Sequence, residues 1–162
     1  VSMEIANTDA EGRVILSDAL SYATLTYAPK AIVDLATLTG ACVVALGENA
    51  AGLLGNNQKW MDKVKLAAEN SGDRAWQLPL WEEYFEQIKS DFADIKNIGG
   101  KSAGTITAAA FLSNFVNDTP WAHVDIAGTA WLDGEKPYMK RGATGFGVRL
   151  LVELAKSLAG KK

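Results

Sequence analysis

The sequence contains a single cysteine and a single histidine among its 162 residues. One cysteine, Cys42, excludes an intrachain disulfide, which fits a protein from a reducing compartment. Cys42 lies in the apolar run TGACVVALG, and the only histidine, His123, is far from it in the sequence. We therefore interpret Cys42 as a small buried hydrophobic residue rather than as a reactive thiol.

Basic clusters and long apolar runs are also missing. The net charge is -3 and the pI is about 5.2, and the terminal GKK is too short to form the basic surface that nucleic-acid binding requires. No apolar run reaches the roughly 18 residues of a membrane span. The opening VSMEIAN has neither the basic start nor the apolar centre of a signal peptide. These absences predict a cytoplasmic protein with no nucleic-acid or membrane partner.

The composition that remains, 48% hydrophobic and 22% charged, is that of a globular protein, and residues 1–162 are predicted to form one folded unit. Apolar spacing predicts helices over 13–28, 57–71, 81–91 and 105–116, and an amphipathic helix that closes the stretch 142–160. It predicts strands over 1–5, 42–47 and 50–56, a buried strand over 30–40 that ends in a glycine turn, and an interior strand that runs into a loop over 121–131. Residues 93–104 are predicted to form a glycine-rich loop, and the helix over 105–116, which is apolar on most sides, is predicted to be well buried. The last helix is predicted to turn Val148, Leu151, Val152, Leu154, Ala155 and Leu158 inward. The alternation of elements predicts an α/β fold, a three-layer α/β/α sandwich around a mostly parallel, mixed sheet.

One polar stretch, NTDAEGR from Asn7 to Arg13, follows the first predicted strand, where ligands of α/β proteins commonly bind. In an extended backbone Asp9 and Glu11 would point to the same side, and two carboxylates aimed together stay ionised when a cation joins them. Oxygen ligands suit Mg²⁺, Mn²⁺ and Zn²⁺, and Arg13 could hold a small anion. The residues alone leave an alternative open, in which both acids cap the following helix.

Four stretches, in this order, resemble the leucyl aminopeptidases of the cytosol aminopeptidase family. They are NTDAEGRVILSDAL, DLATLTGACVVALG, NIGGKSAGTITAAAFL, and WAHVDIAGTAW followed by GATGFGVRLL, and together they span almost the whole chain. The resemblance implies a dinuclear metallopeptidase that removes N-terminal, leucine-like residues from peptides. It implies two divalent ions, Mn²⁺ or Zn²⁺ with Mg²⁺ as a further option, a bicarbonate as catalytic anion, and a homo-hexameric assembly.

The resemblance also implies a role for individual residues. Asp9 corresponds to a metal ligand, Glu11 to a carboxylate that bridges both metals, and Arg13 to the arginine that holds the bicarbonate acting as general base. The substrate is implied to lie against the backbone of one loop and in a small apolar pocket, formed by Thr37, Leu38, Thr39, Gly40, Ile98, Ala127 and Ala130.

Part of the family pattern is missing from this sequence. An earlier segment of the pattern carries a metal-binding lysine, two metal-binding aspartates and a second catalytic lysine, which we expect to precede Val1. The count of charges supports the expectation that ligands are missing, because Asp9 and Glu11 supply only two negative charges against the four positive charges of two divalent ions. We therefore expect a C-terminal portion of the catalytic domain with about half of an active site. The alternative is a folded assembly module that binds metal weakly or not at all.

Other chemically capable residues have simpler interpretations. Asp34, Asp94 and Asp125 are expected to be hydrogen-bonding or helix-capping carboxylates, since buried polar groups are normally paired. His123 is expected to be a satisfied core histidine. Lys101, which follows two glycines, could bind an anion, but is expected to be an exposed loop lysine.

Overall fold

The computed structural model describes residues 1–160 and is built around a four-stranded sheet. The strand order is β2 (Ile32–Ala36), β6 (Trp121–Asp125), β3 (Ala51–Gly55) and β4 (Ala75–Gln77). The pairs β2–β6 and β3–β4 are parallel, and β3–β6 is antiparallel. The sheet is therefore mixed and mostly parallel, and β6, which is buried along its whole length, lies in its interior.

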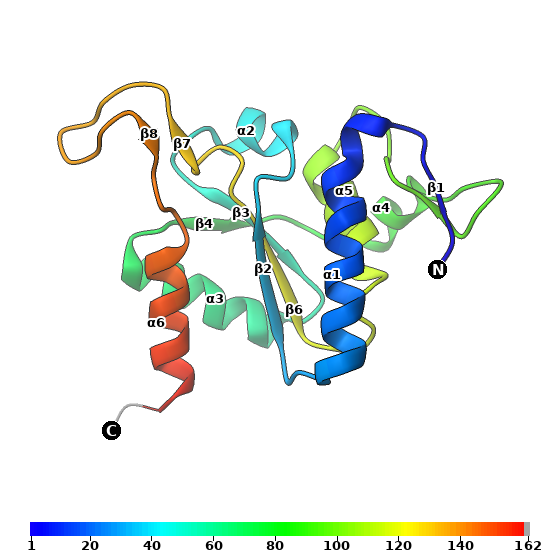
Figure 1. Cartoon of the computed structure of the whole chain (residues 1–162), viewed down its shortest axis with the longest axis horizontal. Helices are drawn as coiled ribbons and strands as arrows, with labels where there is room; N and C mark the ends of the chain where they lie inside the picture. Colours follow the sequence, from blue (N-terminus) through cyan, green and yellow to red (C-terminus); the bar gives the residue numbers. More distant parts are fainter. Residues whose placement is uncertain (161–162) are drawn as a thin grey trace.

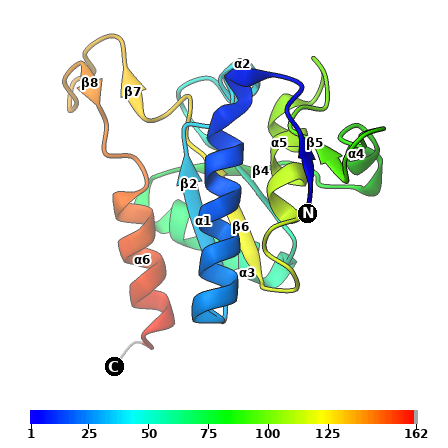
Figure 2. The same ribbon diagram turned by 45° about the vertical axis from the view of Figure 1, so that its right-hand side comes forward.

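Helices cover both faces of this sheet, which confirms the α/β/α sandwich (Figures 1 and 2). On one face lie α1 (Glu11–Tyr27), α4 (Glu82–Glu86) and α5 (Gly104–Ser113), and on the other lie α3 (Gln58–Ser71) and α6 (Val148–Leu158). The short helix α2 (Gly40–Leu46) lies at the same end of the molecule as the first turn of α1, at the top of Figure 1. That end carries the candidate site.

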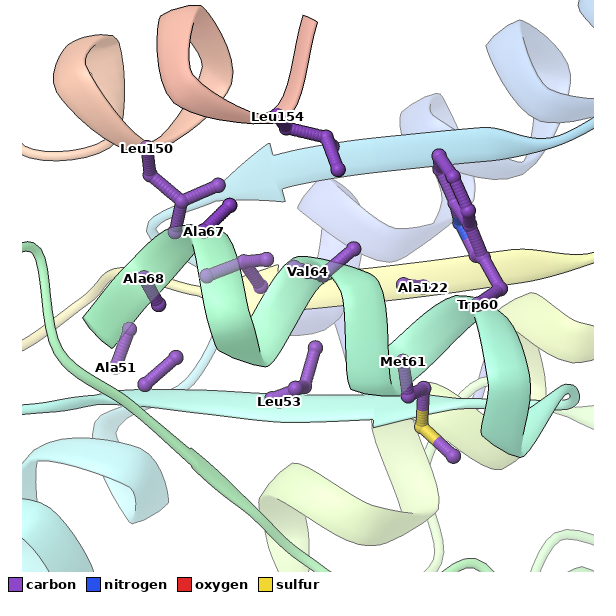
Figure 3. Packing of buried hydrophobic residues seen from close by; sticks show 12 residues of the cluster. Ala51, Leu53, Trp60, Met61, Val64, Ala67, Ala68, Ala122, Leu150 and Leu154 are labelled. Carbon is purple, nitrogen blue, oxygen red and sulfur yellow. The ribbon is translucent and has the colours of Figure 1, made fainter. Parts of the chain in front are cut away.

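The face under α3 and α6 is a closely packed apolar layer. Figure 3 shows α3 lying over β3 and β6, with its side chains Val64 and Ala68 turned toward the sheet. Leu150 and Leu154 of α6 close the layer from the other side, and both are buried. Burial of apolar area at this interface favours folding by roughly 25 cal/mol per Å².

The opposite face is organised by α5, which the sequence predicted to be apolar on most sides. Six consecutive residues of this helix, from Thr107 to Leu112, are fully buried. The last four of them, Ala109 to Leu112, belong to one apolar cluster with Trp121 of β6, Leu54 of β3 and Leu20 of α1. The prediction of a well-buried helix is confirmed.

Two small sheets lie outside the main one. β1 (Met3–Glu4) pairs in parallel with β5 (Ile95–Lys96). β5 lies within a segment that was predicted to be a glycine-rich loop. β7 (Trp131–Leu132) pairs antiparallel with β8 (Gly142–Ala143). The first of these pairs matters for function, because it brings the NTDAEGR stretch beside the NIGGK loop.

Two local predictions were wrong. Residues 42–47 were predicted as a strand but belong to α2, because the Thr39 side chain accepts a hydrogen bond from the Cys42 amide and caps a helix there. In the last helix the buried residues are Leu150 and Leu154, and most of the residues predicted to point inward are exposed: Val148, Leu151, Val152, Ala155 and Leu158. Its apolar surface is wider than the area that α3 and the sheet cover.

No helix within residues 1–160 has the length and apolar character needed to cross a membrane.

Gly55 provides a test of the packing between β3 and β6. A Cβ atom at this position would lie 2.3 Å from the Trp121 carbonyl oxygen, which belongs to the backbone and cannot rotate away. We expect Gly55→Ala to lower the free energy of unfolding by about 1–3 kcal/mol, measured by urea denaturation. Gly134→Ala is the control, because nothing lies within 4 Å of a Cβ there. Equal stability of the two variants would contradict the described strand packing.

Candidate active site

One cleft collects most of the residues that the sequence singled out. It has a volume of about 280 Å³ and lies between the first turn of α1, the loop into α2 and the NIGGK loop. Its lining includes the predicted metal ligands, the predicted anion-binding arginine and five of the predicted substrate-binding residues: Asp9, Glu11, Arg13, Thr37, Leu38, Thr39, Gly40 and Ile98.

The two carboxylates reach this cleft from a backbone that is not extended. Asp9 lies in a single 3-10 turn, Thr8–Ala10, and Glu11 is the first residue of α1. The expectation of an extended D-x-E segment was wrong, although both side chains are exposed and line the cleft. Neither acid caps α1 with its side chain, because the N-cap of α1 is Ala10, which has no side-chain cap hydrogen bond, and Asn7 caps the preceding 3-10 turn by accepting from the Asp9 amide at 2.8 Å. Asp9 and Glu11 still lie in the first turns of these helices, where negative charge is favourable. Neither carboxylate forms an ion pair with another residue of the described chain.

The position of this turn is fixed by Asn97, a residue that the sequence reasoning missed. Asn97 is fully buried, and its side-chain oxygen accepts hydrogen bonds from the amides of Ala6 and Asn7 at 2.9 and 3.2 Å. Its side-chain nitrogen donates to the carbonyl oxygens of Asn7 and Ala10 at 2.7 and 3.4 Å. One amide side chain therefore holds the segment that carries Asp9. An asparagine directly before I-G-G was the only available signal.

Removing this side chain should loosen the turn. We expect Asn97→Ala to lower the free energy of unfolding by about 2–3 kcal/mol, because buried backbone groups lose their partners. Hydrogen exchange of the Ala6 and Asn7 amides should accelerate more than exchange elsewhere. Asn70→Ala, at an exposed position of α3, is the matched control. Unchanged exchange at Ala6 and Asn7 would contradict this role.

Arg13 is a buried cation at the base of the cleft. Only 7% of the residue is exposed, and its Nη1 atom donates to the Asn97 carbonyl oxygen at 3.0 Å. Burial lowers the pKa of the guanidinium from its ordinary value, and the negative charge of Asp125 opposes this by raising it. An arginine in this position offers a fixed positive charge and several N–H donors to an anion in the cleft.

Asp125, at the end of β6, organises the other wall. It is fully buried, and its Oδ1 atom accepts hydrogen bonds from the amides of Leu38 and Ala127, both at 3.1 Å. Its Oδ2 atom accepts one from the Thr39 hydroxyl at 2.6 Å, and that hydroxyl lies 2.8 Å from the Thr105 hydroxyl. The TLTG loop is thus fixed to the sheet by a buried charge. The expectation of a hydrogen-bonding role for Asp125 is confirmed.

The neighbouring thiol has no features of a nucleophile. Cys42 is 1% exposed, and burial followed by the charge of Asp125 raises the pKa of its thiol to about 11, against a smaller lowering by the Gly52 backbone. The thiol contacts the Asp125 carbonyl oxygen at 3.5 Å. The interpretation of Cys42 as a buried, unreactive residue agrees with this environment.

The remaining candidates lie outside the cleft. Ala127 and Ala130 are half-buried in the turn after β6 and do not line it, so their role in a substrate pocket stays a prediction. His123 is buried in the sheet, where its Nδ1 atom lies 2.5 Å from Asp34 Oδ1, and the other Asp34 oxygen accepts from the indole of Trp121 at 2.6 Å.

A third acidic ligand is not found beside the first two. Within residues 1–160 no three or more His, Cys, Asp and Glu side chains come together in a way that could hold a metal ion. Asp9 and Glu11 have the right oxygen chemistry and face open solvent in the same cleft. They fit a divalent ion as part of a ligand set, and two carboxylates are too few for a pair of ions.

Comparison with known proteins gives a consistent result. The profile of the "Cytosol aminopeptidase family, catalytic domain" matches residues 1–152. A "Probable cytosol aminopeptidase" of Geobacter sp. (strain M21) is 59% identical over 152 residues, covering 94% of this chain and 31% of the relative. Proteins of the same description from Geobacter sulfurreducens and Cenarchaeum symbiosum are 59% and 54% identical, over 96% of this chain in both cases. The chain spans about a third of the length of these relatives, 31% and 33% for the last two.

Proposed function

This chain belongs to the cytosol aminopeptidase family, and from that premise we propose that it supplies part of the active site of a metal-dependent aminopeptidase. The proposed substrate is a peptide with a free amino terminus and a leucine-like first residue. The observation that carries the proposal is the cleft, which brings to a single place one buried cation and two carboxylates that form no ion pair within residues 1–160.

The carboxylates are proposed to bind divalent metal, Mn²⁺ or Zn²⁺ with Mg²⁺ as a further option. Asp9 would serve one ion and Glu11 would bridge two, with further ligands from residues outside this chain. Such ions, when bound, polarise the scissile carbonyl and provide a nucleophilic water. The chain's own contribution is placement, since Asn97 fixes the turn that carries Asp9.

Arg13 is proposed to bind bicarbonate, the general base of the reaction. Its guanidinium is held by the Asn97 carbonyl and lies in the field of Asp125, so it is preorganised rather than mobile. Arg13 would hold the bicarbonate in the cleft, and bicarbonate would supply general-base chemistry there. The substrate backbone would lie along Thr37–Gly40, with its first side chain among Ile98, Ala127 and Ala130. A cytoplasmic location and a homo-hexameric assembly complete the proposal.

Metal binding by the chain itself provides a test that does not depend on turnover. Calorimetric titration with Zn²⁺ should show one weak site, and Asp9→Asn or Glu11→Gln should each weaken it by at least about tenfold, because each removes a direct ligand. Asp18→Asn, at an exposed position of α1, the helix that Glu11 begins, is the control. Zn²⁺ affinity that is the same in all four proteins would overturn the assignment of Asp9 and Glu11 as metal ligands.

One observation also supports assembly with other polypeptide. The outer faces of α1 and α6 expose large apolar side chains, among them Leu25 at 77% and Val148 at 62%, and the outer edge of β2 pairs with no strand of the described chain. Apolar surfaces of this kind are typical of interfaces. We expect concentration-dependent association of the isolated chain in sedimentation experiments, and a strict monomer would contradict it.

A further inference from the structure

An apolar groove continues from the candidate active site on the far side of the α2–α5 contact. It has a volume of about 390 Å³ and is lined mainly by small and aliphatic residues: Ala41, Val44, Ala45, Leu78, Lys101, Ala103, Gly104, Thr105 and Ile106. Three of these, Ala41, Lys101 and Gly104, also line the polar cleft. A ligand too long for the cleft can therefore extend into the groove without leaving the protein surface.

Only very small residues separate the cleft from the groove at the point where α2 and α5 meet. A Cβ atom on Gly104 would lie 3.0 Å from the Cβ of Ala41, so the helices are already in close contact at this point. Ala103, the residue before α5, has a positive φ of 53°, a conformation that favours glycine, and it is part of the groove lining. Near Ala41, Ala103 and Gly104 the groove wall is thus formed by backbone and methyl groups.

Among the residues that the structure describes, Lys101 is the single charged residue of the groove lining. It is exposed at the boundary, and it forms no ion pair with another residue of the described chain. Among the described residues no acidic side chain lines the groove, and Asp9 and Glu11 line only the cleft that Lys101 also borders. A carboxylate in the groove therefore meets one cation and no acidic lining residue. An apolar groove with one free cation at its entrance is complementary to an apolar side chain next to a carboxylate.

We propose that this groove binds the C-terminal segment of short peptide substrates, with an apolar side chain in the groove and the free terminal carboxylate paired with Lys101. The inference rests on the proposed function, and it adds a preference for tripeptide-sized substrates that end in an apolar residue. In this proposal the end of the cleft near Glu11 binds the amino terminus of the peptide, and Lys101 binds its carboxyl terminus.

The test uses tripeptides whose scissile bond is reduced to CH₂–NH, so that they cannot be hydrolysed. Binding of Leu-Gly-Phe, its C-terminal amide and Leu-Gly-Gly to the 162-residue chain with Zn²⁺ is followed by NMR of methyl groups. The acid should bind roughly three- to fivefold more tightly than the amide, as expected for an exposed ion pair. Lys101→Gln should abolish this difference, and Ala45→Phe, which fills the groove, should weaken only the peptides that end in phenylalanine.

Control variants distinguish a failure of the groove proposal from a failure of the proposed function. Lys140→Gln and Ala143→Phe place the same changes at exposed positions outside the groove and should behave like the unmodified chain. If Glu11→Gln weakens all three peptides while Lys101→Gln and Ala45→Phe change nothing, the groove proposal is overturned and the proposed function stands. If Glu11→Gln has no effect, the proposed function fails instead. An effect of Ala45→Phe on self-association alone would assign the groove to a second copy of the chain and overturn the proposal.

Discussion

Asp125→Ala is expected to lower the free energy of unfolding by about 3–5 kcal/mol, the cost typical of breaking a buried, hydrogen-bonded charge. The substitution leaves the amides of Leu38 and Ala127 without their acceptor. It also removes the negative charge that opposes the effect of burial on the pKa of Arg13. A buried cation without a nearby anion adds to the cost of the lost hydrogen bonds. Urea denaturation at neutral pH gives the comparison.

Two further variants show which part of this cost is electrostatic. Asp125→Asn keeps the volume and an oxygen acceptor for the amides of Leu38 and Ala127, and its NH2 group can donate to the Thr39 hydroxyl. It removes only the charge, so it should destabilise less than the alanine variant. Asp133→Ala changes an exposed aspartate in the β7–β8 connection and should alter stability by less than about 0.5 kcal/mol. If Asp125→Ala were as mild as Asp133→Ala, the buried network would not stabilise the TLTG loop.

Arg13→Met is expected to reduce peptide hydrolysis by about 10²–10³-fold, the range seen when a preorganised donor to a developing charge is removed. The assay uses the Geobacter sp. (strain M21) relative in which this chain replaces the 152 matched residues. Methionine retains much of the side-chain volume and removes the charge. Bicarbonate should stimulate the unsubstituted chimera and should not stimulate the variant.

Arg141→Met, at an exposed position, is the control for a general effect of lost charge. Arg13→Lys should rescue little, because an ammonium cannot reproduce the planar set of donors. Full bicarbonate stimulation of Arg13→Met would contradict the assignment of the anion to this residue.

The layered fold was readable from the sequence because its signals are local. Alternation of apolar runs and turn residues predicted α1, α3, α5 and three strands of the main sheet, β2, β3 and β6, whereas β4 was not predicted as a strand. The strand predicted over 42–47 failed because short apolar runs do not distinguish a strand from a buried helix, and the capping bond from Thr39 decides the outcome.

The inward face of α6 could not be predicted for a different reason. Apolar residues surround most of this helix, and only tertiary packing against α3 selects Leu150 and Leu154 for burial.

The same limit applies to the candidate active site. The motif suggested that Asp9, Glu11 and Arg13 act together, yet Asn97, more than 80 residues away from them, holds the turn and the arginine in place. Long-range hydrogen bonds leave no periodicity in a sequence.

The most direct test of the central claim is hydrolysis of leucyl p-nitroanilide by the same chimera with Mn²⁺, compared with its Glu11→Gln variant. Glu82→Gln, on the exposed surface of α4, serves as the control. The account predicts turnover by the chimera and by the control, and a loss of at least about 100-fold in the Glu11→Gln variant, as expected for removal of a direct metal ligand. Turnover that survives in Glu11→Gln would show that the cleft is not the catalytic site.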